Sequence, residues 1–320
     1  MNICLVGYGA IAEFHARALS GIEDVRLQWL VGRRAEPMQA FAAKWGIANQ
    51  TLELDEALAD DAVDAVVITS PNALHAPQAT ATLNAGKHVL LEIPIALTLQ
   101  DAERVALLAR QIDRRLMVCH SMRFFPSLAH IRGLVEAGQF HMYQFQGQIF
   151  IKRRTNITAA GKPRSWTDDI LWHHGAHLID MAMWLGDCCE VERVSYHVGP
   201  DYGQQGTMDM SFGMTLANGA IATITQSYFT PGLDWRAMII GHEQTFQWKQ
   251  GQLVDFEDKV VVPEHSIWDL SEQDAEFVAA VREQREPSIT AEAILPAMRA
   301  IAKAQAIADA EKPVRSPFEE

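Results

Sequence analysis

The sequence predicts an α/β protein with two domains: an N-terminal Rossmann domain with a parallel sheet, and a C-terminal α+β domain with a large, mostly antiparallel open sheet. The chain has 320 residues, 48% of them hydrophobic. A single hydrophobic core usually stops growing below this chain length, so two cores are expected. Up to about residue 120, short apolar runs alternate with helix-period segments, as in βα units. From about residue 191 the strand-like runs become longer and are joined by hairpin signals. We therefore place the domains at residues 1–120 and 121–320.

Five short apolar runs are the expected strands of the parallel sheet. They are Ile3–Val6, Val25–Val31, Ala65–Thr69, His88–Leu91 and Leu116–Cys119. Segments with helical periodicity separate them, at residues 10–20, 35–45, 75–85 and 99–112. This alternation predicts βα units and a parallel sheet.

The second domain carries a clear hairpin signal. Asn218-Gly219 joins two strand-like stretches, residues 210–216 and 220–228, and this dipeptide favours the two-residue turns that connect antiparallel strands. The tail from Ser271 onward is expected to form two helices, interrupted near Pro287. An antiparallel sheet followed by helices is therefore predicted for the C-terminal half.

Charge and composition exclude several classes of partner. The formal net charge of -13 disfavours general attraction to nucleic acid or to an anionic membrane. No apolar run reaches membrane-spanning length, and the chain starts directly on a strand-like run instead of a leader peptide. The four cysteines lack metal-ligand spacing and are expected to be reduced thiols. We expect a cytoplasmic protein that binds small molecules.

A glycine motif follows the first strand. Gly7 allows a tight turn, and Gly9 allows a pyrophosphate to approach the backbone. Ala10 and Ile11 then open a helix whose N-terminal amides suit phosphate. Ala12 replaces the third glycine, a change that the motif tolerates. The alternative, an ordinary glycine turn, is disfavoured by the position at the start of a βα series.

Two arginines end the second strand, where an NAD site would carry an acidic residue. Arg33 and Arg34 instead suit the 2′-phosphate of NADP. We predict NADP as cofactor, with NAD possible. The alternative is that one or both arginines simply face solvent.

Four motifs together resemble the Gfo/Idh/MocA oxidoreductase family along essentially the whole chain. They are Gly7-Tyr8-Gly9, Ser70-Pro71-Asn72 with His75, Glu92-x-Pro94, and Gly175-x-His177-x-x-Asp180. The resemblance implies that the second and third motifs bind the cofactor, through Ser70, Asn72, His75, Glu92 and Pro94. It also implies a homodimer or homotetramer formed through the C-terminal sheet.

The chain departs from the family at two places. Most members have a catalytic lysine inside Glu-x-Pro and an aspartate four residues before the catalytic histidine, whereas this chain has Ile93 and His173. The strings Lys152–Asn156, Gly161–Asp168 and Trp172-His173-His174 resemble a subgroup that oxidises the cyclic hemiacetal of a carboxylated ring-cleavage product of protocatechuate, giving 2-pyrone-4,6-dicarboxylate. The substrate that this narrower resemblance implies is a small dicarboxylate.

A histidine is a reasonable base for this reaction. The hydroxyl of a hemiacetal is more acidic than that of a simple alcohol, and imidazole accepts a proton near neutral pH. If residues 170–185 are helical, His173 and His177 lie four apart on one face. We predict His177 as the base, His173 as a second proton-transfer or hydrogen-bonding group, and Asp180 as the residue that orients an imidazole. His174 is expected to point away from this cluster, and Asp180 could instead be structural.

A dicarboxylate requires cationic partners. The expected substrate-binding residues are Arg123, Arg153, Arg154, Arg164 and Trp166, the last from the resemblance. A solvated surface charge is the alternative for each arginine.

Three other functions remain open. The histidines with Asp180 could bind a metal ion, although we expect none because no HExxH glutamate accompanies them. The missing lysine permits a non-catalytic NADP-binding sensor. A sugar or polyol dehydrogenase is the enzymatic alternative, but a neutral substrate gains little from several arginines.

Overall fold

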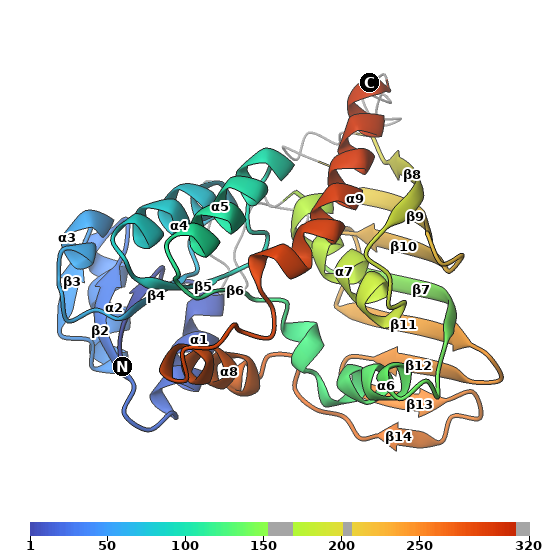
Figure 1. Ribbon diagram of the computed structural model, residues 1–320, viewed down its shortest axis with the longest axis horizontal. Coiled ribbons are helices and arrows are strands. Elements are labelled where there is room, and N and C mark those ends of the chain that lie inside the picture. Colours follow the sequence, from blue (N-terminus) through green and yellow to red (C-terminus); the bar gives the residue numbers. More distant parts are fainter. Residues whose placement is uncertain (153–168, 201–206, 312–320) are drawn as a thin grey trace. The chain divides into compact units, whose positions relative to one another are not determined.

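A computed structural model describes residues 1–152, 169–200 and 207–311 and confirms the predicted fold class (Figure 1). The chain forms two compact units, one made of Met1–Ser121 with Trp268–Leu295 and the other of Met122–Ile267 with Pro296–Glu320. Each unit contains one sheet.

The sheet of the first unit has six strands, each paired in parallel with its neighbours, in the order β3-β2-β1-β4-β5-β6. This is the doubly wound order of a dinucleotide-binding fold, so the chain reverses direction between β1 and β4. The strands are β1 (Asn2–Val6), β2 (Arg26–Val31), β3 (Asn49–Thr51), β4 (Ala65–Ile68), β5 (His88–Leu91) and β6 (Leu116–Val118). Strands β1, β4, β5 and β6 are almost wholly buried, which explains their continuous apolar sequences.

Helices cover both faces of this sheet (Figure 1). They are α1 (Ala10–Ser20), α2 (Ala35–Trp45), α3 (Leu54–Leu58), α4 (His75–Asn84), α5 (Leu99–Gln111) and α8 (Ser271–Arg282). Local signals set several ends: Thr98 accepts a hydrogen bond from the Asp101 amide at the start of α5, and Gly46 ends α2 in the left-handed region. The sequence analysis missed β3 and α3.

The division at residue 120 is incomplete, because a late segment returns to the first unit. The tail does form two helices, α8 and α9 (Ala291–Ala310), separated at Pro287 as expected. Helix α8 packs on α1, and the Val118 amide donates a hydrogen bond to the Ile289 carbonyl. Residues 268–295 therefore belong to the first unit, together with residues 1–121. A single boundary at residue 120 cannot describe this division, because the first unit is made of two separate segments of the chain.

The second unit contains an eight-stranded open sheet in the order β14-β13-β12-β11-β7-β10-β9-β8. All pairs are antiparallel except β7 with β10. The strands are β7 (Met142–Phe150), β8 (Val191–Val198), β9 (Asp209–Leu216), β10 (Ile221–Ser227), β11 (Asp234–Gly241), β12 (Thr245–Lys249), β13 (Gln252–Asp255) and β14 (Val260–Val262). The predicted hairpin is confirmed as β9–β10, with Gly219 at φ +90°.

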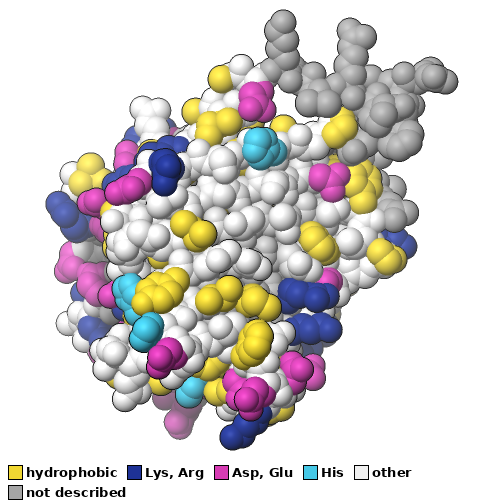
Figure 2. Space-filling model, turned by 90° about the vertical axis from the view of Figure 1, so that its right-hand side faces the viewer, with side chains coloured by type: hydrophobic (Ala, Val, Ile, Leu, Met, Phe, Trp, Pro, Cys, Tyr) yellow, Lys and Arg dark blue, Asp and Glu magenta, His cyan; other side chains and the backbone are white. Residues whose placement is uncertain are grey.

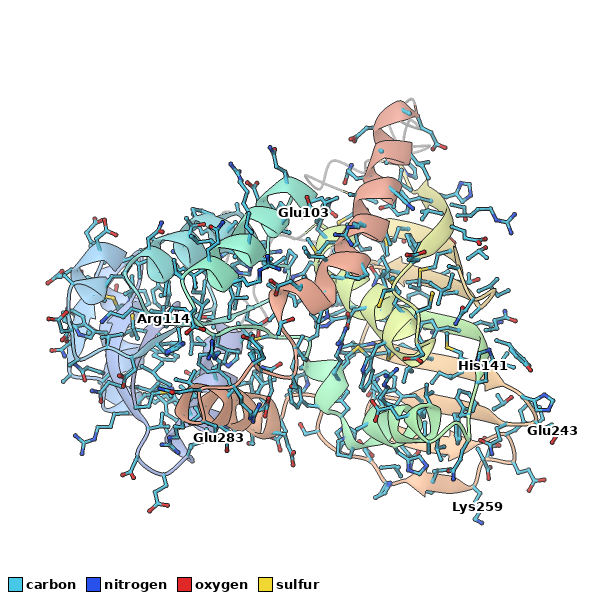
Figure 3. All side chains as sticks on the ribbon, in the orientation of Figure 1. Glu103, Arg114, His141, Glu243, Lys259 and Glu283 are labelled. Carbon is cyan, nitrogen blue, oxygen red and sulfur yellow. The ribbon has the colours of Figure 1, made fainter. Side chains whose placement is uncertain are left out.

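One face of this sheet is covered by helices. Helix α6 (Pro126–Glu136) contacts β13 and β14, while α7 (Ala176–Leu185) contacts β7 and β10. The strands alternate buried and more exposed residues, so their inward side chains form the core beneath α6 and α7. Exposed segments at the ends of the strands carry polar residues such as His141, Glu243 and Lys259 (Figure 3). Across the described residues, no helix combines the length and apolarity needed to cross a membrane.

Candidate active site

The glycine turn has the geometry of a dinucleotide cradle. Gly7 lies at φ +115°, and a Cβ there would stand 2.4 Å from Thr69 Oγ1, so the fold itself requires glycine at this position. Gly9 is different: its φ of −80° is ordinary, and a Cβ would meet nothing within 4 Å. Gly9 begins α1 with no side-chain cap, leaving the amides around Ala10 and Ile11 to bind an anion. The residues present therefore fit a bound pyrophosphate.

Arg33 and Arg34 are exposed directly after β2. Gly32 precedes them, and a Cβ on Gly32 would lie 2.4 Å from the Tyr8 ring, so the turn packs closely against the glycine loop. The carboxyl end of β2 is where the adenosine ribose of a dinucleotide binds in this fold. Arg33 and Arg34 thus lie at the end of the sheet where a 2′-phosphate would bind, and their role in binding it stays a prediction.

His75 joins the two other cofactor motifs. Its Nδ1 lies 2.7 Å from the Pro94 carbonyl oxygen, and its Nε2 lies 2.8 Å from the Ser70 carbonyl oxygen. Burial lowers the pKa of His75, against the two carbonyl contacts, which favour the cation. Ser70 also donates a hydrogen bond to Gln78, and Asn72 begins a short 3₁₀ turn. The Ser70–Asn72 loop is thus tied to the end of β5.

The Glu92–Pro94 motif follows β5, with a cis peptide bond between Ile93 and Pro94. Ile93 is 2% exposed, so this position supplies apolar packing where most of the resembling family has an amine. One oxygen of Glu92 lies 2.9 Å from His15 Nε2, an interaction that the sequence analysis did not predict. The available signal was a histidine on the apolar face of α1.

The segment that carries the histidines is not a uniform α-helix. Residues Leu171–Gly175 form a π-helical turn, in which the Gly175 amide donates to the Ile170 carbonyl, before α7 begins. Asp169 caps the turn through the Leu171 and Trp172 amides. Burial raises the pKa of the Asp169 carboxyl, while these amide bonds oppose the rise. The helix expected over residues 170–185 is therefore α-helical at Ala176–Leu185, while Leu171–Gly175 forms a π turn.

The three histidines lie in the second unit, two of them in contact with each other. The His173 and His174 rings meet edge to face at 4.4 Å, and His174 Nδ1 lies 2.7 Å from the Tyr228 hydroxyl. His174 was expected to point away from the cluster, but its ring contacts that of His173. His177 is partly exposed and lies 5.7 Å from the Trp235 ring. The alternation of β10 continues to Tyr228 and was the signal that could have identified it.

Asp180 and Arg123 form a bidentate ion pair. Arg123 donates from Nε and Nη2 to the two carboxylate oxygens, at 2.9 and 2.5 Å, and the side chains are 14% and 4% exposed. The Arg123 guanidinium also lies 5.7 Å above the Trp184 ring. A guanidinium that already holds a carboxylate of its own chain is a weaker candidate for a substrate carboxylate. This geometry favours the structural alternative for Asp180.

Gln226 is a buried amide that the sequence analysis missed. It is 2% exposed on β10, two residues before Tyr228 and on the same face. Within the described part of the chain, neither amide atom has a hydrogen-bond partner. A buried unsatisfied amide is costly, so a polar ligand is a reasonable explanation for it.

We expect Gln226→Leu to raise the free energy of unfolding by about 1–3 kcal/mol, because the variant removes an unsatisfied buried amide. If the amide binds substrate, KM rises at the same time. Thermal unfolding and steady-state kinetics measure the two effects. The matched control is Gln146→Leu, at an exposed position on the neighbouring strand β7, where we expect a change within about 0.5 kcal/mol. Lower stability in Gln226→Leu would contradict the prediction.

Four predicted substrate-binding residues, Arg153, Arg154, Arg164 and Trp166, lie outside the described residues. The metal alternative receives no support at residues 173–180: in the described ranges, the three potential ligands that converge are His15, Glu92 and Cys119.

Comparison with known proteins covers both units. Residues 1–120 match the model of the Gfo/Idh/MocA oxidoreductase family with an NAD-binding Rossmann fold, and residues 126–265 match that of the C-terminal region of bacterial oxidoreductases. The chain is 37% identical over 306 residues to 4-carboxy-2-hydroxymuconate-6-semialdehyde dehydrogenase of Sphingobium sp. (strain NBRC 103272 / SYK-6), covering 94% of this chain and 96% of that protein.

Two further similarities are more limited. An NADP-dependent scyllo-inositol 2-dehydrogenase of Bacillus subtilis is 34% identical over 132 residues, covering 41% of this chain and 40% of that protein. The crystal structure of GenD2 from gentamicin A biosynthesis, in complex with NAD, superposes with a TM-score of 0.83 at 23% identity, covering 99% of this chain and 96% of that chain. The structural match supports the fold alone.

Proposed function

Because the chain belongs to the Gfo/Idh/MocA family of NAD(P)-dependent oxidoreductases, we propose that it oxidises the cyclic hemiacetal of 4-carboxy-2-hydroxymuconate-6-semialdehyde to 2-pyrone-4,6-dicarboxylate with NADP. The observation that carries the proposal is the 37% identity to a dehydrogenase of that semialdehyde along nearly the whole of both chains. The buried Ile93 is consistent with the proposal. The proposed oxidation of a hemiacetal uses a histidine as base, so it does not need a lysine at this position.

The proposed reaction requires a hydride acceptor and a base. The Gly7–Ile11 turn, with Arg33 and Arg34, would hold NADP, which would supply the hydride acceptor for the hemiacetal carbon. His177 of α7 accepts the hydroxyl proton, so that the C–O bond becomes the lactone carbonyl. Its neighbour Trp235 is 7% exposed and limits the freedom of the imidazole. His173 is the second candidate for proton transfer. The role that we give Asp180 is to fix the position of α7 through its ion pair with Arg123.

The substrate carboxylates require charge-assisted hydrogen bonds. Arg153, Arg154 and Arg164, with Trp166, remain our candidates for this task, whereas Arg123 is reassigned to Asp180. Arg33 and Arg34 support the preference for NADP over NAD, because both are exposed after β2.

The test is a spectrophotometric assay of NADPH formation with the hemiacetal as substrate, repeated with NAD. We expect turnover with the hemiacetal and weaker activity with NAD. A polyol dehydrogenase is the second candidate, favoured by the partial identity to a scyllo-inositol 2-dehydrogenase. Turnover of scyllo-inositol but not of the hemiacetal would therefore replace the first proposal. Binding of NADP with no turnover of any hydroxy substrate would indicate a sensor.

We also propose a homodimer or homotetramer formed through the outer face of the second unit's sheet. Outward positions of β7, β9 and β10 are largely uncharged: Gln144, Gln146, Gln148, Ser211, Thr215, Thr223 and Thr225. Figure 2 views the side that carries these strands, and its charged side chains lie mainly toward the margins. An uncharged sheet face is inexpensive to desolvate against a second copy.

Analytical ultracentrifugation should accordingly give two or four times the mass of one chain. Thr223→Arg should shift the protein toward monomer, because it places like charges opposite one another near a two-fold axis. Lys259→Ala, at an exposed edge turn (Figure 3), is the control and should leave the mass unchanged. A monomeric wild type would contradict the proposal.

The four cysteines are free thiols, two of them buried. This agrees with the cytoplasmic location that we propose, since secreted proteins commonly pair such residues.

A further inference from the structure

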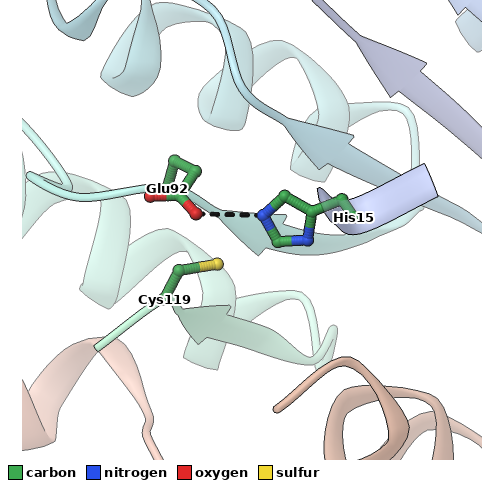
Figure 4. Close-up of side chains that lie close together, drawn as sticks. All are labelled: His15, Glu92 and Cys119. Atoms are coloured by element: carbon green, nitrogen blue, oxygen red, sulfur yellow. Dashed lines mark hydrogen bonds and ion pairs between the residues drawn. The ribbon is translucent and has the colours of Figure 1, made fainter. Parts of the chain in front are cut away.

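A buried cluster of ionisable side chains lies inside the first unit, close to the cofactor motifs. His15 of α1 is 0% exposed and contacts carboxylates on both sides. Its Nδ1 lies 3.0 and 2.8 Å from the two oxygens of Asp274 on α8, and its Nε2 lies 2.9 Å from Glu92 Oε1. Asp274 is 0% exposed and the Glu92 side chain 14%. Figure 4 shows His15 and Glu92 with the thiol of Cys119 beside them.

The hydrogen bonds fix the number of protons in the cluster. Each contact joins an imidazole nitrogen to a carboxylate, so each needs one proton, and the cluster needs two. With two protons, His15, Asp274 and Glu92 carry a net charge of about −1; with one proton the charge is about −2, in a site that excludes water. The one-proton state, in which a neutral His15 lies between two charged carboxylates, is therefore the unfavourable one.

The cluster also connects the elements that form the cofactor site. Helix α1 begins at Gly9, whose following amides suit the pyrophosphate, and His15 projects from the same helix. Glu92 begins the Glu92–Pro94 segment at the carboxyl end of β5, the edge where dinucleotides bind. The Pro94 carbonyl oxygen is in turn bound by His75. Two histidines thus hold this segment, one through a carboxylate and one through a carbonyl.

We infer that His15 is a positioning residue for the cofactor: as an imidazolium it keeps the Glu92 carboxylate inside the first unit, and so keeps the Glu92–Pro94 segment in the arrangement that binds NAD(P). Loss of the proton leaves two facing carboxylates without a cation between them. Glu92, the more exposed of the two, then turns toward solvent and moves the adjoining segment. The added negative charge also opposes the anionic cofactor. The inference needs only the cofactor, so it is independent of the substrate proposed above.

Among the described residues, the charged or titratable groups that face His15 are Asp274 from α8, Glu92 after β5 and Cys119 after β6. Burial by itself would lower the pKa of His15, but the charge of Asp274 and the hydrogen bonds that His15 shares with Asp274, Cys119 and Glu92 raise it well above the ordinary value. For Asp274 the effect of burial has the opposite sign: burial raises the pKa of this carboxyl, and the nearby His15 opposes the rise. We favour the cation on His15, because both of its nitrogens face carboxylate oxygens. A raised imidazole pKa keeps the proton at neutral pH and releases it as the pH rises.

A metal ion is the alternative occupant of this cluster. One imidazole nitrogen, one Glu92 oxygen and the Cys119 sulfur lie within 4.8 Å of one another. The nitrogen-to-oxygen distance of 2.9 Å is, however, that of a direct hydrogen bond. Burial also raises the pKa of the Cys119 thiol, which opposes the thiolate that a metal would need. A shared proton accounts for the geometry more simply.

The test measures the Kd of NADPH by fluorescence between about pH 6 and about pH 10, with the melting temperature recorded at each pH. We expect wild-type affinity to fall at alkaline pH. His15→Gln should bind NADPH about tenfold more weakly at neutral pH and should lose the alkaline fall. Asp274→Asn retains an acceptor oxygen but removes the main counter-charge, so its alkaline fall should move to lower pH.

The matched control is His88→Asn, at the start of β5, the strand that Glu92 directly follows. Burial, with Arg114 and Arg115 nearby, lowers the pKa of His88 to about 4, so it stays neutral across this range. Its profile should match that of the wild type. A flat wild-type profile, or an unmoved fall in Asp274→Asn, would overturn the inference even if His15→Gln fails to fold. Stoichiometric zinc in untagged wild-type protein, absent from His15→Gln, would show that the cluster holds a metal ion instead of a shared proton. This result would also overturn the inference.

Discussion

Replacing His177 with alanine is expected to lower kcat for hemiacetal oxidation by about 10²–10⁴-fold, the usual contribution of a positioned general base. The imidazole is partly exposed and lies against the Trp235 ring, so it is both accessible and restrained. Steady-state kinetics with saturating NADP measure the effect. Because the group acts on the bound substrate, we expect the loss mainly in kcat and little change in the Kd of NADPH.

The control for His177 is His141→Ala, an exposed histidine of the same unit (Figure 3). It should retain full activity. A larger loss in His173→Ala than in His177→Ala would transfer the role of base to His173, and unchanged kcat in both variants would remove the histidine mechanism while leaving the family assignment intact.

The largest effect on stability is expected for Arg123→Ala, which leaves Asp180 as a buried carboxylate without its bidentate partner. Removing one side of a buried ion pair commonly costs about 3–5 kcal/mol in the free energy of unfolding. The side chains are 14% and 4% exposed, so water can replace little of the lost interaction. Chemical denaturation measures the change. The double variant Arg123→Met with Asp180→Leu should recover much of the loss, since no unpaired charge remains.

Arg236→Ala provides the matched comparison. Arg236 pairs with Asp234 on the sheet surface and is 52% exposed, so its loss should cost no more than about 1 kcal/mol. If Arg123→Ala were equally mild but raised KM for the dicarboxylate, Arg123 would return to the substrate-binding role first predicted for it.

The sequence predicts most of the first unit because strands β1, β4, β5 and β6 are buried on both faces and their sequences are continuous apolar runs. The runs at residues 65–69 and 88–91 correspond closely to β4 and β5. Strand β3 and helix α3 were missed because Asn49–Thr51 is short and polar and Leu54–Leu58 spans little more than one helical turn. Neither is long enough for periodicity to identify it.

The side-chain partnerships were much harder to predict than the motifs. The π turn at residues 171–175 cannot be distinguished from an α-helix by apolar spacing, so the environment of His174 came only from the structure. Arg123 and Asp180 are 57 residues apart in the chain, and His15 and Asp274 are 259 apart. A single sequence shows which residues are suited to ion pairing but not which of them meet.

The discontinuous first unit also affects how the chain folds during synthesis. When residue 121 leaves the ribosome, the Rossmann sheet can form, but the helix that supplies Asp274 has not yet been made. At about 5–20 residues per second, residues 122–267 delay it by on the order of ten seconds. During this interval His15 and Glu92 lack Asp274, so one side of their site stays open to water until α8 has been synthesised.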